Sequence, residues 1–325
     1  MASTKPLPRL GGNGIIDLHV HIGPEFIRRR YNAATLAEEA RREGIGVVMK
    51  NHFQPTTGWI STVRAPDDAV PLIGSVALNF ACGGFDTHGI RSALSGLKTD
   101  LAASAPDAAR FVVWMPTVSA EAHLNLFNRR DIDLNWGVDK EYTELIPEGQ
   151  GLRLMRTDGA LNPGALRVFQ VIADRDLVLA TGHLDRTETG ILVENAHAAG
   201  VRRMVLTHPL WHGIQFDPAT LAQLFQRYQA YSELCFTNLD VNGIDHLTID
   251  QYVEVIRTVG PEGVVLSSDC GQTFTPSVAD CARIFFSMLA EKGVTEDEII
   301  QMAIINPRRL LFAPRHSFSA PGTGG

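Results

Sequence analysis

Residues 14–24 read GIIDLHVHIGP, a short apolar run that carries an aspartate and two histidines before a Gly-Pro turn. His19 and His21 are two residues apart, so on a strand both side chains point to the same side. Short β-branched runs of this kind recur along the chain and alternate with amphipathic stretches. This alternation is typical of βαβ units on a parallel sheet.

Eight such runs are expected to form strands, over residues 14–20, 46–50, 70–78, 110–115, 177–181, 203–207, 232–238 and 263–268. Helical patterns lie between them, over residues 33–44, 163–176, 187–200 and 248–260. A last helical pattern follows at 294–304, and we expect Pro307 to stop it. The order predicts an α/β fold, a (β/α)8 TIM barrel, rather than an open doubly wound sheet. A dinucleotide-binding fold would need a GxGxxG turn after the first strand, where HIGPEF stands instead.

The interval 117–163 is too long for a simple connection and contains an alternating GLRLMRT piece. We expect a β-hairpin-like insertion between strands four and five that covers the mouth of the barrel. Residues 1–13 are predicted to be an N-terminal arm and residues 14–312 a single barrel. Residues 313–325 end in a small, polar, Gly/Pro-rich run, which predicts a flexible tail.

Composition narrows the class of partner. Of the 325 residues, 45% are hydrophobic and 20% are charged, the balance of a soluble globular protein. The net charge of −7 argues against nucleic acid and anionic membranes as partners and favours a small-molecule substrate. The chain shows no signal peptide and no apolar run long enough to cross a bilayer, so we expect a cytoplasmic protein. Its four cysteines are scattered without a CxxC pair, which predicts reduced, mostly buried thiols.

Polar residues also follow other predicted strands. His183 comes just after strand five, His208 after strand six and Asp269 after strand eight. The carboxyl ends of barrel strands are where barrel enzymes hold their catalytic groups. His19 and His21 alone would also fit a pair of hydrogen-bonded core histidines. Together with the other three they predict a metal centre, because neutral imidazole is a common ligand of divalent ions.

This pattern resembles the amidohydrolase superfamily, which has HxH on strand one, single His ligands after strands five and six, and Asp after strand eight. The resemblance implies the ligands His19, His21, His183, His208 and Asp269. The pieces DLHVHIGP, MKNH, VVWMPT, ATGH, THP, SSDCGQ and INPRRLL together are similar to an uncharacterised bacterial branch of amidohydrolase-like proteins. That similarity runs from about residue 14 to 311 and implies a fold and a metal site, but no substrate.

One position departs from the superfamily pattern. Many members carry a carboxylated Lys or a Glu at the end of strand four, where this chain reads VVWMPT. Lys50, at the end of strand two, is the available substitute. Either it is carboxylated and bridges two ions, or the site holds one ion and Lys50 contacts the substrate. A lumen Lys paired with a carboxylate is the structural alternative.

Several residues are candidates for supporting a ligand or binding substrate. His52 follows Lys50 by two residues and is predicted to do either. Arg29 and Arg30 belong to a run of three arginines after strand one. These side chains either lie on a solvated surface or bind a carboxylate of the substrate. Further candidates for substrate contact are Arg156, Trp136 and Trp211.

The resemblance implies a hydrolase that uses a metal-activated water to cleave an amide, cyclic amide, lactone or ester bond in a small molecule, neutral or anionic. Zn is the first choice of ion, with Mn, Fe or Co as alternatives and one or two ions per chain. Asp269 would ligate the metal and take the proton of the water, and His208 would be a ligand or a base. The alternatives are a mononuclear deaminase or non-oxidative decarboxylase, and a non-catalytic binding barrel. Barrels of this kind often self-associate, so a homo-oligomer is expected.

Overall fold

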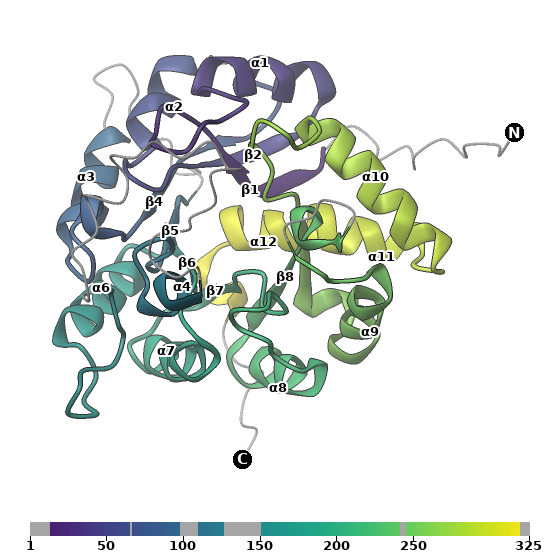
Figure 1. Cartoon of the computed structure of the whole chain (residues 1–325). Coiled ribbons are helices and arrows are strands. Elements are labelled where there is room, and N and C mark those ends of the chain that lie inside the picture. The colour runs from purple at the N-terminus through teal and green to yellow at the C-terminus, as the bar shows by residue number, and fades with distance from the viewer. Residues whose placement is uncertain (1–13, 66, 98–109, 127–150, 241–244, 319–325) are drawn as a thin grey trace, which may run out of the picture.

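The computed structural model of the protein describes residues 14–65, 67–97, 110–126, 151–240 and 245–318 (Figure 1). Within them the strands form two parallel hydrogen-bonded sheets, in the orders β1–β2–β3 and β4–β5–β6–β7–β8–β9. The strands are β1 (Ile16–His21), β2 (Gly46–Lys50), β3 (Leu72–Ile73), β4 (Ser75–Ala77), β5 (Val112–Trp114), β6 (Val178–Ala180), β7 (Arg203–Leu206), β8 (Ala230–Cys235) and β9 (Val264–Ser267).

The two sheets approach each other at both ends. Gly74 alone separates β3 from β4, so these are two parts of the predicted third strand. A Cβ at Gly74 would lie 2.6 Å from the Cα of Thr57, so only glycine fits there. At the other end, Val20 of β1 pairs in parallel with Cys270 just after β9, and the backbone NH of His21 donates to the Cys270 carbonyl (2.7 Å). The eight predicted strands are therefore present, in the predicted order.

Helices follow the strands and lie around them in Figure 1. They are α1 (Ala33–Glu43), α2 (Thr57–Val63), α3 (His88–Gly96), α4 (Glu121–Leu126), α6 (Pro163–Asp174), α7 (Arg186–Ala198), α8 (Pro218–Tyr228), α9 (Ile249–Val259), α10 (Val278–Glu291), α11 (Glu296–Ile300) and α12 (Asn306–Phe312). Local signals define their ends. For example, Asn32 and Thr35 form a capping box at the start of α1, and Gly44 ends it in the left-handed conformation.

The strands bury a different apolar cluster on each side. Adjacent residues Val47 and Val48 of β2 belong to different clusters, as the alternation of a strand requires. The larger cluster packs against the surrounding helices. The smaller one also contains Leu310 and Leu311 of α12. Because the backbone of Arg110, just before β5, donates to the Leu311 carbonyl, α12 lies at the amino ends of the strands.

Pro307 does not end the last helix, contrary to the prediction. Residues Gln301–Ile305 form a π-helical turn (η6) that leads from α11 into α12, and Pro307 lies in the first turn of α12. The missing proline N–H is tolerated there because first-turn N–H groups have no intrahelical partner. Asn306 anchors this junction, because its side-chain amide donates to the carbonyls of Pro261 (2.8 Å) and Val264 (2.6 Å).

Arg203 at the start of β7 fastens the C-terminal segment to the strands. Its fully buried guanidinium pairs with Asp176 (2.9 Å) and donates to the carbonyls of Arg309, Leu310 and Ala313. We expect Arg203→Met to lower the free energy of unfolding by about 3 kcal/mol, because the carboxylate and the carbonyls lose their donors. Urea unfolding would measure this. Exposed Arg175→Met is the control, and equal losses in both variants would contradict the assignment.

Part of the segment predicted as a flexible tail is structured, and residues 319–325 lie outside the described residues. Residues Arg315–Phe318 form a short 3-10 helix (η7), and the Phe318 ring is buried beneath the guanidinium of Arg203 (4.3 Å). An aromatic contact thus holds residues that their composition placed in the tail.

The four cysteines are free and buried, as predicted. In the described part of the chain, none of the helices combines the length and apolar character needed to span a membrane.

Candidate metal centre

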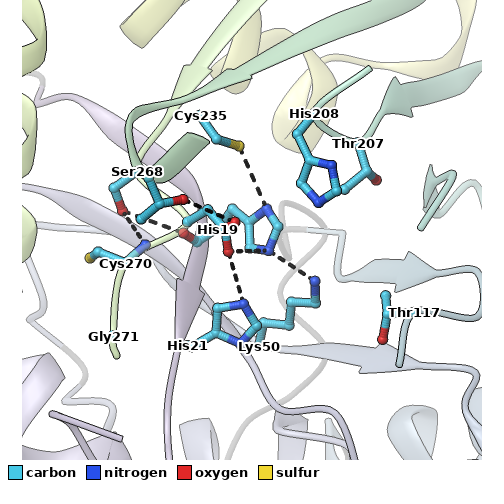
Figure 2. Close-up of polar contacts among 12 residues, drawn as sticks. His19, His21, Lys50, Thr117, Thr207, His208, Cys235, Ser268, Cys270 and Gly271 are labelled. Carbon is cyan, nitrogen blue, oxygen red and sulfur yellow. Dashed lines mark hydrogen bonds and ion pairs between the residues drawn. The ribbon is translucent and has the colours of Figure 1, made fainter. Parts of the chain in front are cut away.

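The six residues predicted as ligands lie together at the carboxyl ends of the strands, and Figure 2 shows four of them around one centre. They are His19 and His21 on β1, Lys50 on β2, His183 after β6, His208 after β7 and Asp269 after β9. Most of their side chains are fully buried. Asp269 keeps 14% of its side chain exposed and His183 is half-buried, so the centre is most accessible beside these two residues.

A β-bulge in β1 turns the histidines inward. The β1–β2 register shifts between Asp17 and Val20. Leu18 belongs to the smaller apolar cluster, called inner here because it lies on the side of the strands away from the surrounding helices. Val20 belongs to the larger, outer cluster, which packs against those helices. The His19 ring contacts Trp114 of the inner cluster, with centroids 4.4 Å apart. Adjacent residues Leu18 and His19 therefore both face inward. Asp17 accepts the backbone NH of His19 (2.9 Å) at the point where the bulge interrupts the ladder.

His19, His21 and Asp269 form what we call the first donor set. The Nε2 atoms of His19 and His21 lie 3.0 and 2.9 Å from the same Asp269 carboxylate oxygen. The other Asp269 oxygen accepts the hydroxyl of Thr237 (3.1 Å), which orients the carboxylate. Two imidazole nitrogens and a carboxylate oxygen thus converge on one small volume.

Glu233 on β8 determines which His19 nitrogen is free to bind a ligand. Its carboxylate lies 3.3 Å from His19 Nδ1, and Cys235, two residues further along the strand, places its sulfur 4.0 Å from the same nitrogen. When Nδ1 donates to Glu233, Nε2 presents a lone pair to the carboxylate oxygen of Asp269. Two lone pairs facing each other at 3.0 Å need a positive charge beside them. A metal ion held by both atoms would supply it, as does the Lys50 ammonium, 2.9 Å from His19 Nε2, so the first donor set fits a metal ion.

His183 and His208 form the second donor set. Their Nε2 atoms lie 3.2 Å apart, and the Nδ1 of His183 lies 2.8 Å from the Nδ1 of His123. Trp211 stands beside this set, with its ring 5.1 Å from that of His183 and 5.4 Å from that of His208. When His183 donates through Nδ1 to His123, its Nε2 lone pair is directed toward His208 Nε2, as a shared cation would require.

The histidines have the charge state that a ligand needs. Burial lowers the pKa of His19 to about 3. It also lowers the pKa values of His21, His183 and His208 well below the usual range of histidine. All four rings are therefore neutral near pH 7. A neutral imidazole offers a lone pair to a metal ion, whereas a protonated imidazole has none to offer.

Lys50 contacts the first donor set, and its charge acts on the second. Its amine nitrogen is 2.9 Å from His19 Nε2 and 4.1 Å from the centre of the Trp114 ring. Burial lowers the pKa of Lys50 to about 8, and its charge depresses the pKa values of His183 and His208 after the larger effect of burial. The end of the fourth strand contributes the buried hydroxyl of Thr117 but no anionic group. Lys50 thus contacts the first donor set directly, through His19.

The backbone is strained at two of the site residues. His208 has φ +27° and Asp269 has φ +53°, in the left-handed region that residues with a Cβ rarely adopt. Gly271 follows at φ +117°, and a Cβ there would lie 2.2 Å from the His21 carbonyl. Such strain costs of order 1–3 kcal/mol per residue and clusters at functional sites. Here it directs His208 and Asp269 toward the centre.

The loop after β1 covers the first donor set. Glu25 accepts from Arg29 Nε (2.5 Å) and from the backbone NH of His52 (2.7 Å). The His52 ring lies 4.7 Å from that of His21, and its Nδ1 is 2.9 Å from the hydroxyl of Thr117. The structure therefore places His52 and Arg29 beside the centre.

The other predicted substrate contacts are placed differently. Trp211 belongs to the wall of the site. The Arg30 guanidinium donates to the Thr275 carbonyl (3.0 and 2.7 Å). Arg156 is more than half exposed and pairs with Asp158 (2.7 Å) in a tight turn at 154–162, where Met155 bridges to Leu161. Trp136 lies outside the described residues, as do residues 127–150 of the predicted insertion.

Sequence reasoning missed three residues of the site. Glu25 and His123 come from connecting segments, and no periodic pattern shows where such side chains point. Glu233 had a signal, because it stands within the strand text SELCFTN two residues before Cys235, the spacing that singled out His19 and His21. A buried carboxylate on a barrel strand needs a partner as much as a buried imidazole does.

Comparison with solved structures defines the class of fold. An amidohydrolase from Mycoplasma synoviae is 13% identical, with 95% of this chain and 92% of that chain covered and a TM-score of 0.56. An organophosphorus hydrolase from Deinococcus radiodurans is 16% identical, with 93% of each chain covered and a TM-score of 0.50. A phosphotriesterase homology protein from Escherichia coli, with phosphate in its active site, is 13% identical, with 92% and 99% covered and a TM-score of 0.50.

The chain therefore has the fold of amidohydrolase-superfamily proteins, as the resemblance in sequence implied. It belongs to a family of unknown function (DUF6282), whose model matches residues 14–233. None of the curated proteins compared with it matches. The matched residues include the first donor set except Asp269, all of the second donor set, and Lys50.

Proposed function

We propose that this chain is a metal-dependent hydrolase that cleaves an amide, cyclic amide, lactone or ester bond in a small molecule. The observation that carries the proposal is the convergence of neutral His19 and His21 on one oxygen of Asp269. Contacts to the far nitrogens of His19 and His183 support it, because they direct the Nε2 lone pairs of these two rings inward. We also propose that residues 14–312 form one closed (β/α)8 barrel with this centre at its mouth.

The first donor set would hold one divalent ion. The second donor set would either provide further ligands to that ion or hold a second ion. When bound, an ion such as Zn, Mn, Fe or Co supplies a water of lowered pKa and polarises the carbonyl oxygen of the substrate. The Asp269 carboxylate would accept a proton from the attacking water as the water oxygen bonds to the carbonyl carbon. It returns that proton to the leaving nitrogen or oxygen as the scissile bond breaks.

The protein prepares Asp269 for this role. Burial raises the pKa of its carboxyl group above the usual range of aspartate, which makes it a stronger proton acceptor than an exposed aspartate. Thr237 fixes one oxygen, so the other remains directed at the centre. His208, buried and neutral, would stabilise the negative charge that develops on the carbonyl oxygen or serve as a ligand.

The number of ions distinguishes this proposal from a second candidate. A mononuclear deaminase or non-oxidative decarboxylase is favoured by one observation, the absence of an anionic residue at the end of the fourth strand, which reads VVWMPT. Two ions would need a carboxylated Lys50 between them. With one ion, the Lys50 amine would contact the substrate instead.

Metal removal tests the proposal. We expect protein stripped with a chelator to lose turnover of lactone, ester and amide probes, because the hydrolytic water then keeps its ordinary pKa. Adding back Zn or Mn should restore turnover of the same probe. Circular dichroism before and after stripping separates loss of the ion from loss of the fold. Undiminished hydrolysis by stripped protein would refute the role of the metal.

A further inference from the structure

We propose that Arg29 binds a carboxylate group of the substrate, so that the enzyme acts on carboxylate-bearing small molecules. This inference rests on the proposed function, since it concerns the same site. It starts from the three consecutive arginines at residues 28–30, because only one of their guanidinium groups is buried in the structure. The side chain of Arg29 is 1% exposed, whereas Arg28 and Arg30 are exposed residues.

One edge of the buried guanidinium is already bonded. Glu25, whose side chain is fully buried, accepts from Arg29 Nε at 2.5 Å, and its other oxygen accepts the backbone NH of His52. Glu25 is therefore fixed at both oxygens and holds the guanidinium in one orientation. The charge of Arg29 is compensated without use of its two terminal nitrogens.

The other edge has donors without acceptors. Among the residues that the structure describes, none accepts a hydrogen bond from Arg29 Nη1 or Nη2, although both atoms are buried. A buried donor left unpaired costs about 1–3 kcal/mol, more when it is charged. The two terminal nitrogens form the fork that matches both oxygens of a carboxylate. An oxyanion of the substrate would satisfy them together.

This edge adjoins the metal centre. The loop that carries Arg29 is fixed to the segment after Asp269, because Arg29 forms an antiparallel bridge with Gln272 and the Arg30 NH donates to the Gly271 carbonyl (2.7 Å). Glu25, which holds the guanidinium, has a carboxylate oxygen within 4.8 Å of ring nitrogens of His21 and His52, so the guanidinium adjoins the first donor set. A substrate held by Arg29 would thus present a second group to the centre.

Matched pairs of probes test the inference. Unbranched dicarboxylates from malonate to adipate would be titrated calorimetrically into metal-loaded protein, each beside its monoamide, in which one carboxylate is a neutral carboxamide. One carboxylate can occupy the metal centre and the other Arg29. We expect at least one dicarboxylate to bind about 10- to 100-fold more tightly than its monoamide, the range of a charge-assisted pair.

Two variants assign that preference to Arg29. Arg29→Lys keeps a positive charge beside Glu25 but loses the fork, and Arg29→Met loses both. We expect the ratio of dicarboxylate to monoamide affinity to fall to near one in each variant. Exposed Arg28→Met, on the same loop, should keep the wild-type ratio. Thermal unfolding and metal content of every variant exclude a general effect on the fold or the ion.

The outcomes separate this inference from the proposed function. Protein that holds metal but binds each dicarboxylate and its monoamide equally overturns the inference alone. A preference that persists in both Arg29 variants also overturns it, because the metal would then be the source of selectivity. Protein that binds no metal at all contradicts the proposed function instead.

Discussion

Replacing Asp269 with asparagine is expected to lower kcat for hydrolysis by about 10³-fold while the protein stays folded. Asparagine keeps the size of the side chain and an oxygen that can face His19 and His21. It loses the negative charge and cannot accept the proton of the attacking water. Steady-state kinetics on a reconstituted, metal-loaded variant would measure the loss.

Two further variants show whether the loss comes from the carboxylate at the centre. Asp174→Asn changes an exposed carboxylate on α6 and should leave kcat unchanged. Thr237→Val removes the hydroxyl that orients Asp269 and should lower kcat by about tenfold, as expected when one neutral hydrogen bond is lost. An Asp269→Asn variant with wild-type kcat would show that another residue accepts the proton.

The fold could be predicted from sequence because its signals are local. The eight apolar runs are short, β-branched and bounded by turn residues, so their order along the chain indicates a parallel arrangement without knowledge of contacts. Errors occurred where a distant contact overrides local preference. The run 70–78 is divided at Gly74 by the close approach of Thr57 on α2. The run 232–238 turns into a 3-10 helix (η3, Phe236–Asn238) after Cys235.

The six candidate ligands were predictable for a related reason. Each stands at or just after the end of a strand, and parallel strands bring those ends to one edge. The residues that orient them were harder to find. His123 lies in α4, within the connection after strand four, and Glu25 lies in the loop after β1. The position of a side chain in such a segment depends on the path of the loop, which tertiary contacts determine.

The roles of the arginines could not be separated from sequence either. Three consecutive arginines have the same charge and the same local text, so pattern reasoning treats them alike. The structure distinguishes them through the pairing of Arg29 with Gln272, which directs that side chain toward Glu25. Arg30 then points to the Thr275 carbonyl. Alternation along an extended backbone gives neighbouring arginines different partners.

Wild-type protein is expected to hold about two ions per chain and Lys50→Ala about one, as a two-metal site with a bridging ligand requires. The reason is the position of Lys50, whose amine lies 2.9 Å from His19 Nε2 and acts electrostatically on the second donor set. A free ammonium there would repel divalent ions. Its carbamate, formed when the neutral amine adds CO2 and releases a proton, would supply two anionic oxygens.

Burial favours that reaction, because it lowers the pKa of Lys50 to about 8 and so increases the neutral fraction near pH 7. Elemental analysis of metal-saturated protein would count the ions. Protein prepared in ¹³C-labelled bicarbonate should show a carbamate carbon resonance that Lys50→Ala lacks. Exposed Lys292→Ala, which loses only its ion pair with Asp250, should keep both the ions and the resonance.

Lys50→Glu distinguishes a bridging anion from a structural lysine. A glutamate supplies carboxylate oxygens at the same strand position without CO2, so we expect it to retain the second ion that Lys50→Ala loses. A lysine needed only as a buried positive charge near Asp269 and Glu233 would predict the opposite, because a third carboxylate would be repelled by these two. One ion in wild type and in all variants would make the centre mononuclear. Lys50 would then be free to contact substrate, and deaminase or decarboxylase chemistry would replace hydrolysis as the function to test.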